Sequence, residues 1–131
     1  MKNQPTFFAP MIYLQELAPA IHFYKTAFDA IVLRQWKNED ASIHVAEMSI
    51  NGALFQLHEE VKRINELSPG TLKGTSVAIG LFVDDPHKVM AQAVLAGGTE
   101  IEPVKDYDYN YRQGCLGDPF GHHWLIEKRI G

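Results

Sequence analysis

The chain has 131 residues, of which 46% are hydrophobic and 21% charged, and its formal net charge is −4. This composition is typical of a globular domain with one hydrophobic core. The acidic balance argues against a nucleic-acid groove, and no apolar run reaches the ~20 residues that a membrane-spanning helix needs. The single cysteine, Cys115, excludes an internal disulfide, and the polar start carries no secretion signal, so we expect a cytoplasmic protein.

The first half of the chain predicts one strand, one helix and three further strands. Residues 7–14 form an apolar run typical of a buried strand. Apolar side chains then follow at helical spacing from Leu17 to Phe28. Runs at 30–36, 43–50 and 53–58 predict strands, and Asn51-Gly52 between the last two is the strongest hairpin signal in the chain. Residues 61–75, rich in turn residues near their end, predict a connection with one short helical turn.

The second half repeats this order. Residues 77–83 predict a strand, Asp85-Pro86 predicts the start of a helix, and Gly97-Gly98 predicts its end. Runs at 99–104, 113–116 and 123–128 predict three more strands. The polar and aromatic stretch 106–112 lies between the first two of these three.

A fixed offset relates the two halves. Leu14 and Val83 precede the two helices, Gly52 and Gly121 precede the two last strands, and each pair is 69 positions apart. We therefore predict one α+β domain, residues 1–131, with two βαβββ modules at about 5–60 and 76–131. A right-handed helical crossover makes the first and fourth strands of each module parallel neighbours. One face of each curved mixed sheet then stays free of its own helix, and two such faces enclose a cleft.

Two local motifs resemble those of a known superfamily. Residues 20–28, AIHFYKTAF, are similar to the first-helix motif of the vicinal oxygen chelate proteins, and residues 117–124, GDPFGHHW, are similar to the turn before their last strand. This superfamily contains glyoxalases, bleomycin-resistance proteins and extradiol dioxygenases. The resemblance covers essentially the whole chain, favours the branch that includes PhnB-like proteins, and implies the βαβββ fold. It does not by itself imply a reaction.

The resemblance also locates the metal ligands of the metal-using members. Matching the two motifs assigns the four ligand positions to Ala9, Gln56, Ala78 and Leu125, which are again related by the offset of 69. Three of these side chains have no donor atom, and the fourth offers only an amide. We therefore expect no cofactor at this place. A displaced divalent-metal site formed by His58, Glu127 and His123 is the alternative, because positions two residues along a strand share a face.

Strand alternation and the aromatic stretch supply the candidate ligand-binding residues. Polar groups on the inward face are Gln56, His58, His123 and Glu127, among apolar neighbours such as Met11. Tyr109, Tyr111 and Arg112 form a second group, which Trp36 faces across a dimer. The same residues are also compatible with a rim of solvated side chains and a filled core.

The leading hypothesis is metal-free binding of a small organic molecule in the cleft between modules or across a homodimer. The apolar walls would bury the ligand, and Glu127 or His58 would orient a polar or cationic group. A metal-dependent lyase, isomerase or dioxygenase, with Glu127 moving the proton, is the alternative, so the sequence leaves open whether the protein is an enzyme. A structural or regulatory module with a filled cleft is the second alternative. We expect no nucleic-acid or membrane partner.

Overall fold

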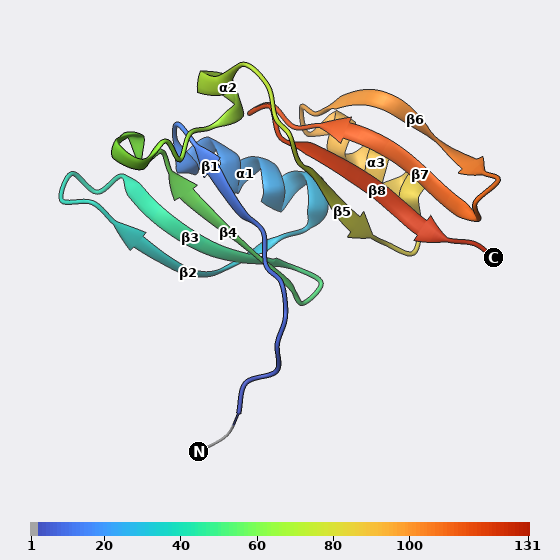
Figure 1. The fold of residues 1–131 in the computed structure, drawn as a ribbon, viewed down its shortest axis with the longest axis horizontal. Coiled ribbons are helices and arrows are strands. Elements are labelled where there is room, and N and C mark those ends of the chain that lie inside the picture. The colour runs from blue at the N-terminus through green and yellow to red at the C-terminus, as the bar shows by residue number, and fades with distance from the viewer. Residues whose placement is uncertain (1–2) are drawn as a thin grey trace.

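The computed structural model describes residues 3–131 as two consecutive βαβββ modules (Figure 1). The first module contains β1 (Met11–Leu14), α1 (Leu17–Phe28), β2 (Ile31–Lys37), β3 (Ile43–Ile50) and β4 (Ala53–Glu59). The second contains β5 (Ala78–Phe82), α3 (Pro86–Leu95), β6 (Thr99–Tyr107), β7 (Tyr111–Gly117) and β8 (His123–Arg129). Between them lie η1 (Lys62–Ile64) and α2 (Pro69–Leu72). The predicted α+β class and the duplicated unit are confirmed.

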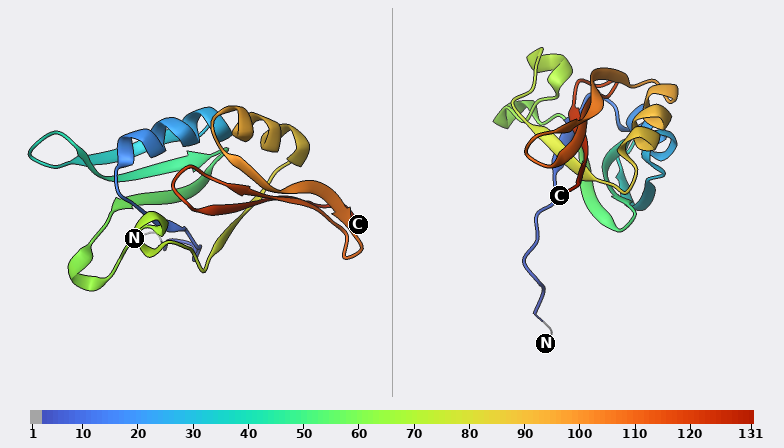
Figure 2. Two further views of the ribbon diagram at one scale, coloured as in Figure 1. Left: turned by 90° about the horizontal axis from the view of Figure 1, so that it is seen from above. Right: turned by 90° about the vertical axis from the view of Figure 1, so that its right-hand side faces the viewer.

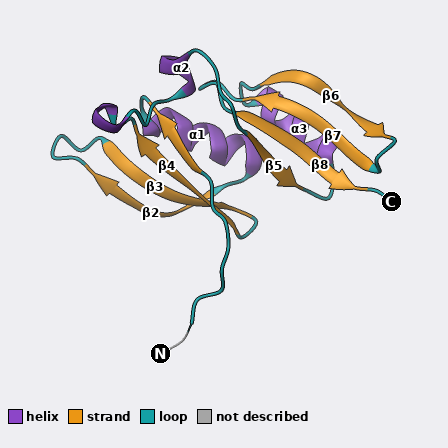
Figure 3. Ribbon diagram, viewed as in Figure 1, coloured by secondary structure: helices purple, strands orange, loops and turns teal. Residues whose placement is uncertain are grey.

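Each module forms one four-stranded mixed sheet, ordered β1-β4-β3-β2 in the first and β5-β8-β7-β6 in the second (Figure 3). The predicted parallel pairing of first and fourth strands is confirmed for β1 with β4 and for β5 with β8. Asn51 and Gly52 have φ angles of 48° and 88°, which suit the two-residue hairpin turn that their sequence predicts. Asp85 caps α3 by accepting from the Lys88 N–H, as expected.

The sequence offset is also a structural offset. Tyr13 pairs with His58, and Phe82 pairs with Glu127, each member lying 69 positions after its counterpart. Strand β7 pairs with β8 in a register shifted by one residue from that of β3 with β4. The shift arises because Asp118 N–H donates to the His122 carbonyl and closes a turn that is one residue longer than Asn51-Gly52. The two modules therefore present equivalent backbone positions to their surroundings.

Three strand boundaries differ from the prediction by two residues or more. The strand expected at 7–14 begins at Met11, since Pro10 has no N–H with which to continue the ladder, although its carbonyl accepts from Gln56 N–H at 2.8 Å. Residues 7–9 lie outside the strand, and Phe8 is 99% exposed. The strands expected at 99–104 and 113–116 extend to Tyr107 and from Tyr111, so the aromatic stretch is the end of a hairpin rather than a loop.

Both long helices lie on the same side of the sheets. Helices α1 and α3 lie next to each other, and the opposite sheet faces are covered by neither of them (Figure 2). The N-terminal segment leaves the body of the molecule at the seam where β1 and β5 approach each other (Figure 1). Of the helices in residues 3–131, none is both long and apolar enough to cross a bilayer.

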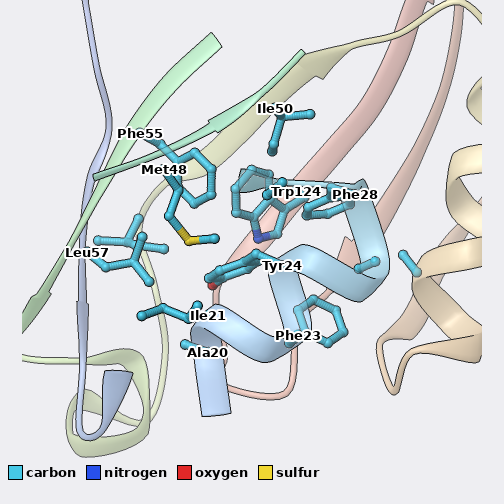
Figure 4. Close-up of a cluster of buried hydrophobic side chains, with 14 of the residues drawn as sticks. Ala20, Ile21, Phe23, Tyr24, Phe28, Met48, Ile50, Phe55, Leu57 and Trp124 are labelled. Carbon is cyan, nitrogen blue, oxygen red and sulfur yellow. The ribbon is translucent and has the colours of Figure 1, made fainter. Parts of the chain in front are cut away.

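The core is continuous across the modules because Trp124 of β8 lies among side chains of the first module (Figure 4). Its ring lies 5.5 Å from Tyr24, 4.9 Å from Phe28 and 5.7 Å from Phe55, measured between centroids. Phe55 and Trp124 are also repeat partners, 69 positions apart. Where α1 carries Tyr24, α3 carries the fully buried Ala93, so the seam is filled mainly from one helix. This packing holds the two modules in one orientation.

A buried carboxylate reinforces the seam. Asp118 accepts hydrogen bonds from the Tyr24 hydroxyl at 2.5 Å, from Trp124 Nε1 at 3.0 Å and from two backbone N–H groups of its own turn. Burial is the main cause that raises the pKa of Tyr24 well above its ordinary value, and the negative charge of Asp118 is the second. The hydroxyl therefore keeps its proton and donates a hydrogen bond to Asp118. The His122 ring lies with Nε2 2.9 Å from the Tyr13 carbonyl of β1. The turn motif thus connects the modules.

Candidate functional site

The open face of each sheet carries the residues that alternation predicts. In the first module, Met11 and Tyr13 of β1 share a face with Gln56 and His58 of β4. In the second module, the same face contains His123, Leu125 and Glu127 of β8, and the strand partners Ala78, Gly80 and Phe82 of β5. The helix-side neighbours on these strands, such as Leu57 and Trp124, are buried in the core. The side chains on the open face are therefore the ones available to a ligand.

Glu127 is the most distinctive group on this face. Its side chain is only 5% exposed, and its Oε1 accepts a hydrogen bond of 2.7 Å from Gln113 Nε2 on β7. The carboxylate lies over Gly80, where an added Cβ would approach Oε2 to 2.6 Å. Gly80 therefore makes the space that Glu127 occupies. Gln113 was not a predicted site residue, since its position opposite Glu127 depends on the hairpin register.

Four aromatic rings form a continuous ladder that begins at Phe82, the strand partner of Glu127. Phe82 and Tyr111 have ring centroids 6.0 Å apart, Tyr111 and Tyr109 are 5.7 Å apart, and Tyr109 and Tyr107 stack at 5.1 Å. The Tyr109 hydroxyl lies 3.1 Å from Gln113 Oε1 and donates to it. The chain Tyr109–Gln113–Glu127 thus orients the carboxylate. The structure brings the predicted residues Tyr109, Tyr111 and Glu127 together.

Arg112 lies on the wrong face for the site to which it was assigned. Because it follows Tyr111 directly on β7, its side chain points to the opposite side of the sheet. There its Nε donates to Asp106 Oδ1 at 2.8 Å and its Nη2 donates to Oδ2 at 3.2 Å. These bonds hold the pKa of Asp106 below its ordinary value. The expectation for Arg112 came from grouping it with the tyrosines of residues 106–112 without a strand assignment.

The first module carries a different cluster around His58. The His58 ring lies 5.6 Å from Tyr13 and 4.8 Å from His44, and His44 Nδ1 lies 2.6 Å from Glu59 Oε1. His44 is the extra residue of a β-bulge, since Trp36 pairs with Val45 while Lys37 pairs with Ile43. A bulge redirects side chains, which explains why sequence alternation missed His44 and Glu59.

The residues at the four metal-ligand positions of the family do not fit a metal ion. Gln56 pairs with Met11 and Leu125 pairs with Gly80, so Ala9 and Ala78 are equivalent positions two residues before those partners. The four assigned positions are therefore two equivalent pairs, one in each module. An alanine, a leucine and a second alanine supply no donor atom, and one glutamine amide is a weak ligand.

An apolar groove of about 1030 Å³ lies at this place instead. Its walls come from the N-terminal segment, the start of β4 and β5, and they include Ala9, Leu54, Ala78 and Gly80. Phe7 and Phe8 also line it and are largely exposed in the single chain. The groove has the size and apolar character of a small-molecule site.

The chain does not bring the displaced metal-site candidates together. His58 lies on β4 of the first module, whereas Glu127 and His123 lie on β8 of the second. His123 lines a separate hollow near α2, with Ser68 and Phe120. Within residues 3–131, no group of three or more His, Cys, Asp or Glu side chains has the geometry to hold a metal ion. Trp36 is 40% exposed on β2, with the Arg34 guanidinium 4.7 Å from its ring centroid, and lies in the other module from Tyr109.

Cys115 shares the open face with Leu125 but is not poised as a nucleophile. Burial, together with the negative charge of Glu102, raises the pKa of its thiol above the ordinary value. The thiolate is therefore disfavoured at neutral pH.

Comparison with known proteins connects this fold to a large group. The model of the Glyoxalase/Bleomycin resistance protein/Dioxygenase superfamily matches residues 7–126. An uncharacterized protein of Mycobacterium tuberculosis strain H37Rv is 34% identical over 125 residues, which are 93% of this chain and 74% of the relative. The crystal structure of an Arabidopsis thaliana gene product has 26% sequence identity and a TM-score of 0.72, and the match covers 94% of this chain and 98% of the Arabidopsis chain. TioX from Micromonospora sp. ML1 is similar in fold, with 16% identity, a TM-score of 0.77, and coverage of 96% and 100%.

Proposed function

This chain belongs to the Glyoxalase/Bleomycin resistance protein/Dioxygenase superfamily, and we propose that within it the protein binds a small organic molecule without a metal ion. One observation carries the proposal. Ala9 and Ala78 stand at positions where metal-using members have metal-binding side chains, and here both alanines line an apolar groove. A groove of this kind favours burial of an apolar ligand, at roughly 25 cal/mol per Å² of surface removed from water. The mechanism would be sequestration, as in a binding protein of the bleomycin-resistance or PhnB-like type.

We also propose that a second copy of the chain covers the open faces. Phe7 and Phe8 are 63% and 99% exposed on a segment that leaves the body of the molecule, and Trp36 and Phe82 are 40% and 52% exposed on the sheets (Figure 1). Exposed apolar surface of this extent is typical of an interaction face. Sedimentation equilibrium at micromolar concentration should give the mass of a homodimer. A monomer at 100 µM would contradict this part of the proposal.

The groove can be tested by filling it. A library of small aromatic and aliphatic fragments is screened by ligand-observed NMR against the wild type and against Ala78→Phe, whose new ring would enter the groove. Ala18→Phe, an equally exposed alanine on α1 outside the groove, is the matched control. We expect fragments that bind the wild type and the control and lose binding to Ala78→Phe. An absence of hits, or hits that survive in Ala78→Phe, would contradict the binding function.

Elemental analysis tests the metal-free part. Protein purified without chelator is expected to contain no stoichiometric divalent metal. A stoichiometric metal that is lost in a His58→Ala, Glu127→Ala double variant would instead support the metal-dependent alternative.

A further inference from the structure

We infer that Glu127 binds a protonated nitrogen of the ligand, and that the ligand carries this group on an aromatic body. The inference rests on the proposed function, because it names the chemical class of molecule that the open face would hold. It is carried by the unfinished hydrogen bonding of one buried carboxylate and by what surrounds it.

Residues 3–131 contain two buried carboxylates that differ in how many of their oxygens accept hydrogen bonds. Asp118, 7% exposed, accepts four hydrogen bonds and is saturated by the protein itself. Glu127, 5% exposed, accepts one bond, from Gln113, and its Oε2 has no hydrogen-bond donor among residues 3–131. A carboxylate offers about four acceptor sites. Oε2 is open to solvent, since no fully buried side-chain nitrogen or oxygen within residues 3–131 lacks a hydrogen-bond partner. Glu127 therefore has unused capacity for a cationic donor.

No cation within residues 3–131 forms an ion pair or a hydrogen bond with Glu127. Lys128 Nζ donates to the Asp84 carbonyl at 3.0 Å, and the Arg129 guanidinium lies 5.5 Å from the Phe82 ring centroid. The salt bridges within residues 3–131 are His44–Glu59 and Arg112–Asp106, both at other sites. A ligand cation would thus be the first ion partner of Glu127, and a charge-assisted hydrogen bond in this half-enclosed place is of the stronger kind.

The neighbouring rings favour the same class of ligand. Phe82 is the strand partner of Glu127, and the ladder continues through Tyr111 to Tyr109, which is 54% exposed. Aromatic faces attract cations and stack on flat aromatic groups. The chain's own Lys105 already lies 5.1 Å from the Tyr107 ring centroid, which shows that this ladder accepts ammonium groups.

Gly80 connects the carboxylate to the apolar groove, because Oε2 lies against it and it also lines the groove. It is exposed, it carries no side chain, and it lines the apolar groove as well as the space under Oε2. The aromatic body of a ligand lying along the groove and ladder can therefore bring its amine to Oε2.

Three probes with one indole ring and different charge test the inference. Tryptamine is a cation at neutral pH, tryptophol is neutral, and indole-3-acetate is an anion. Affinities measured by isothermal titration calorimetry and ligand-observed NMR are expected to follow this order, with tryptamine about tenfold or more tighter than tryptophol. Equal affinity for the charged and neutral probes, tighter binding of the anion, or no tryptamine binding at 1 mM would overturn the inference. Fragment hits in the groove without this charge preference would leave the proposed function standing.

The variant Glu127→Gln keeps the shape of the side chain and removes its charge. It should abolish the preference for tryptamine and leave tryptophol binding within about twofold. Glu102→Gln, an exposed carboxylate on the same sheet face, is the matched control and should keep the preference. Phe82→Leu should weaken both probes together, since it removes stacking rather than charge. Retention of the tryptamine preference in folded Glu127→Gln would contradict the assignment, and the wild-type probe series decides the question should that variant not fold.

Discussion

In both modules the first and fourth strands pair in the same register, but they present different chemistry at equivalent positions. Tyr13 beside His58 in the first module corresponds to Phe82 beside Glu127 in the second. His58 is half-buried next to His44, whereas Glu127 is 5% exposed beside a ladder of aromatic rings. The comparison teaches that the duplicated backbone determines where a side chain stands, and that neighbouring strands determine what it can bind.

The hairpins that flank the two positions explain the difference. The hairpin between β6 and β7 carries Tyr107, Tyr109 and Tyr111, and Tyr109 reaches Gln113 to close the face over Glu127. The hairpin between β2 and β3 is polar, and its Asn38 bonds Ser42 and Glu59 rather than covering His58. One module thus has a partly enclosed acidic and aromatic site, while the other has an open cluster of histidines.

The largest effect is expected from removing the carboxylate that ties the second module to the first. The first module has only the short Asn51-Gly52 turn at the position of the Asp118 turn. Asp118→Ala leaves the Tyr24 hydroxyl, Trp124 Nε1 and two backbone N–H groups without their acceptor, and should lower the free energy of unfolding by about 3 kcal/mol or more. Urea unfolding of the variant and the wild type measures this change in the free energy of unfolding. Asp108→Ala, an exposed control, should have almost no effect, and equal effects of the two changes would refute the role of Asp118.

A smaller effect is expected where the second module makes room for Glu127. Gly80 stands at the position that Met11 occupies in the first module, and a Cβ there would lie 2.6 Å from Glu127 Oε2. Gly80→Ala should therefore cost about 1–3 kcal/mol of stability and displace the carboxylate. Gly74→Ala, with no atom within 4 Å of the new Cβ, is the control.

A double variant isolates the contact between Gly80 and the carboxylate. In a Glu127→Ala background the Gly80→Ala change should lose most of its cost, as measured in a double-mutant cycle. A cost that persists unchanged in that background would show that the strain arises elsewhere.

The smallest effect is expected at the ion pair of Arg112 and Asp106, whose counterparts 69 positions earlier are Ile43 and Lys37, a pair without opposite charges. Hydrogen bonds from Arg112 lower the pKa of Asp106, so this pair adds stability above the carboxyl's unfolded-state pKa and loses it as the pH falls through the folded-state pKa. Arg112→Ala should raise the pKa of Asp106 toward its ordinary value in an NMR titration, with little change in unfolding at pH 7 because the pair is solvent-exposed. An unchanged Asp106 titration would contradict the assignment.

Much of the architecture follows from local patterns. Helical spacing from Leu17 to Phe28, the Asn51-Gly52 turn and the Asp85-Pro86 cap each act over a few residues, and the structure has all three. Strand alternation likewise places Glu127 and His58 on the open face, because the period of two needs no knowledge of the partner strand.

Local sequence patterns could not predict which side chains meet across neighbouring strands. The β-bulge that turns His44 toward Glu59 exists only because β2 and β3 pair with a shift. Arg112 was assigned to the aromatic site because it adjoins the tyrosines in sequence, and strand alternation places its side chain on the other face. Gln113 became the partner of Glu127 through the register of β7 with β8.

The sequence by itself determined the duplicated α+β fold and the face on which Glu127 lies. It could do so because hydrophobic periodicity, turn chemistry and side-chain composition are properties of the chain read one segment at a time. Only the tertiary structure decided that Asp118 is saturated and Glu127 is not, since the number of donors around a carboxylate depends on residues brought from distant strands.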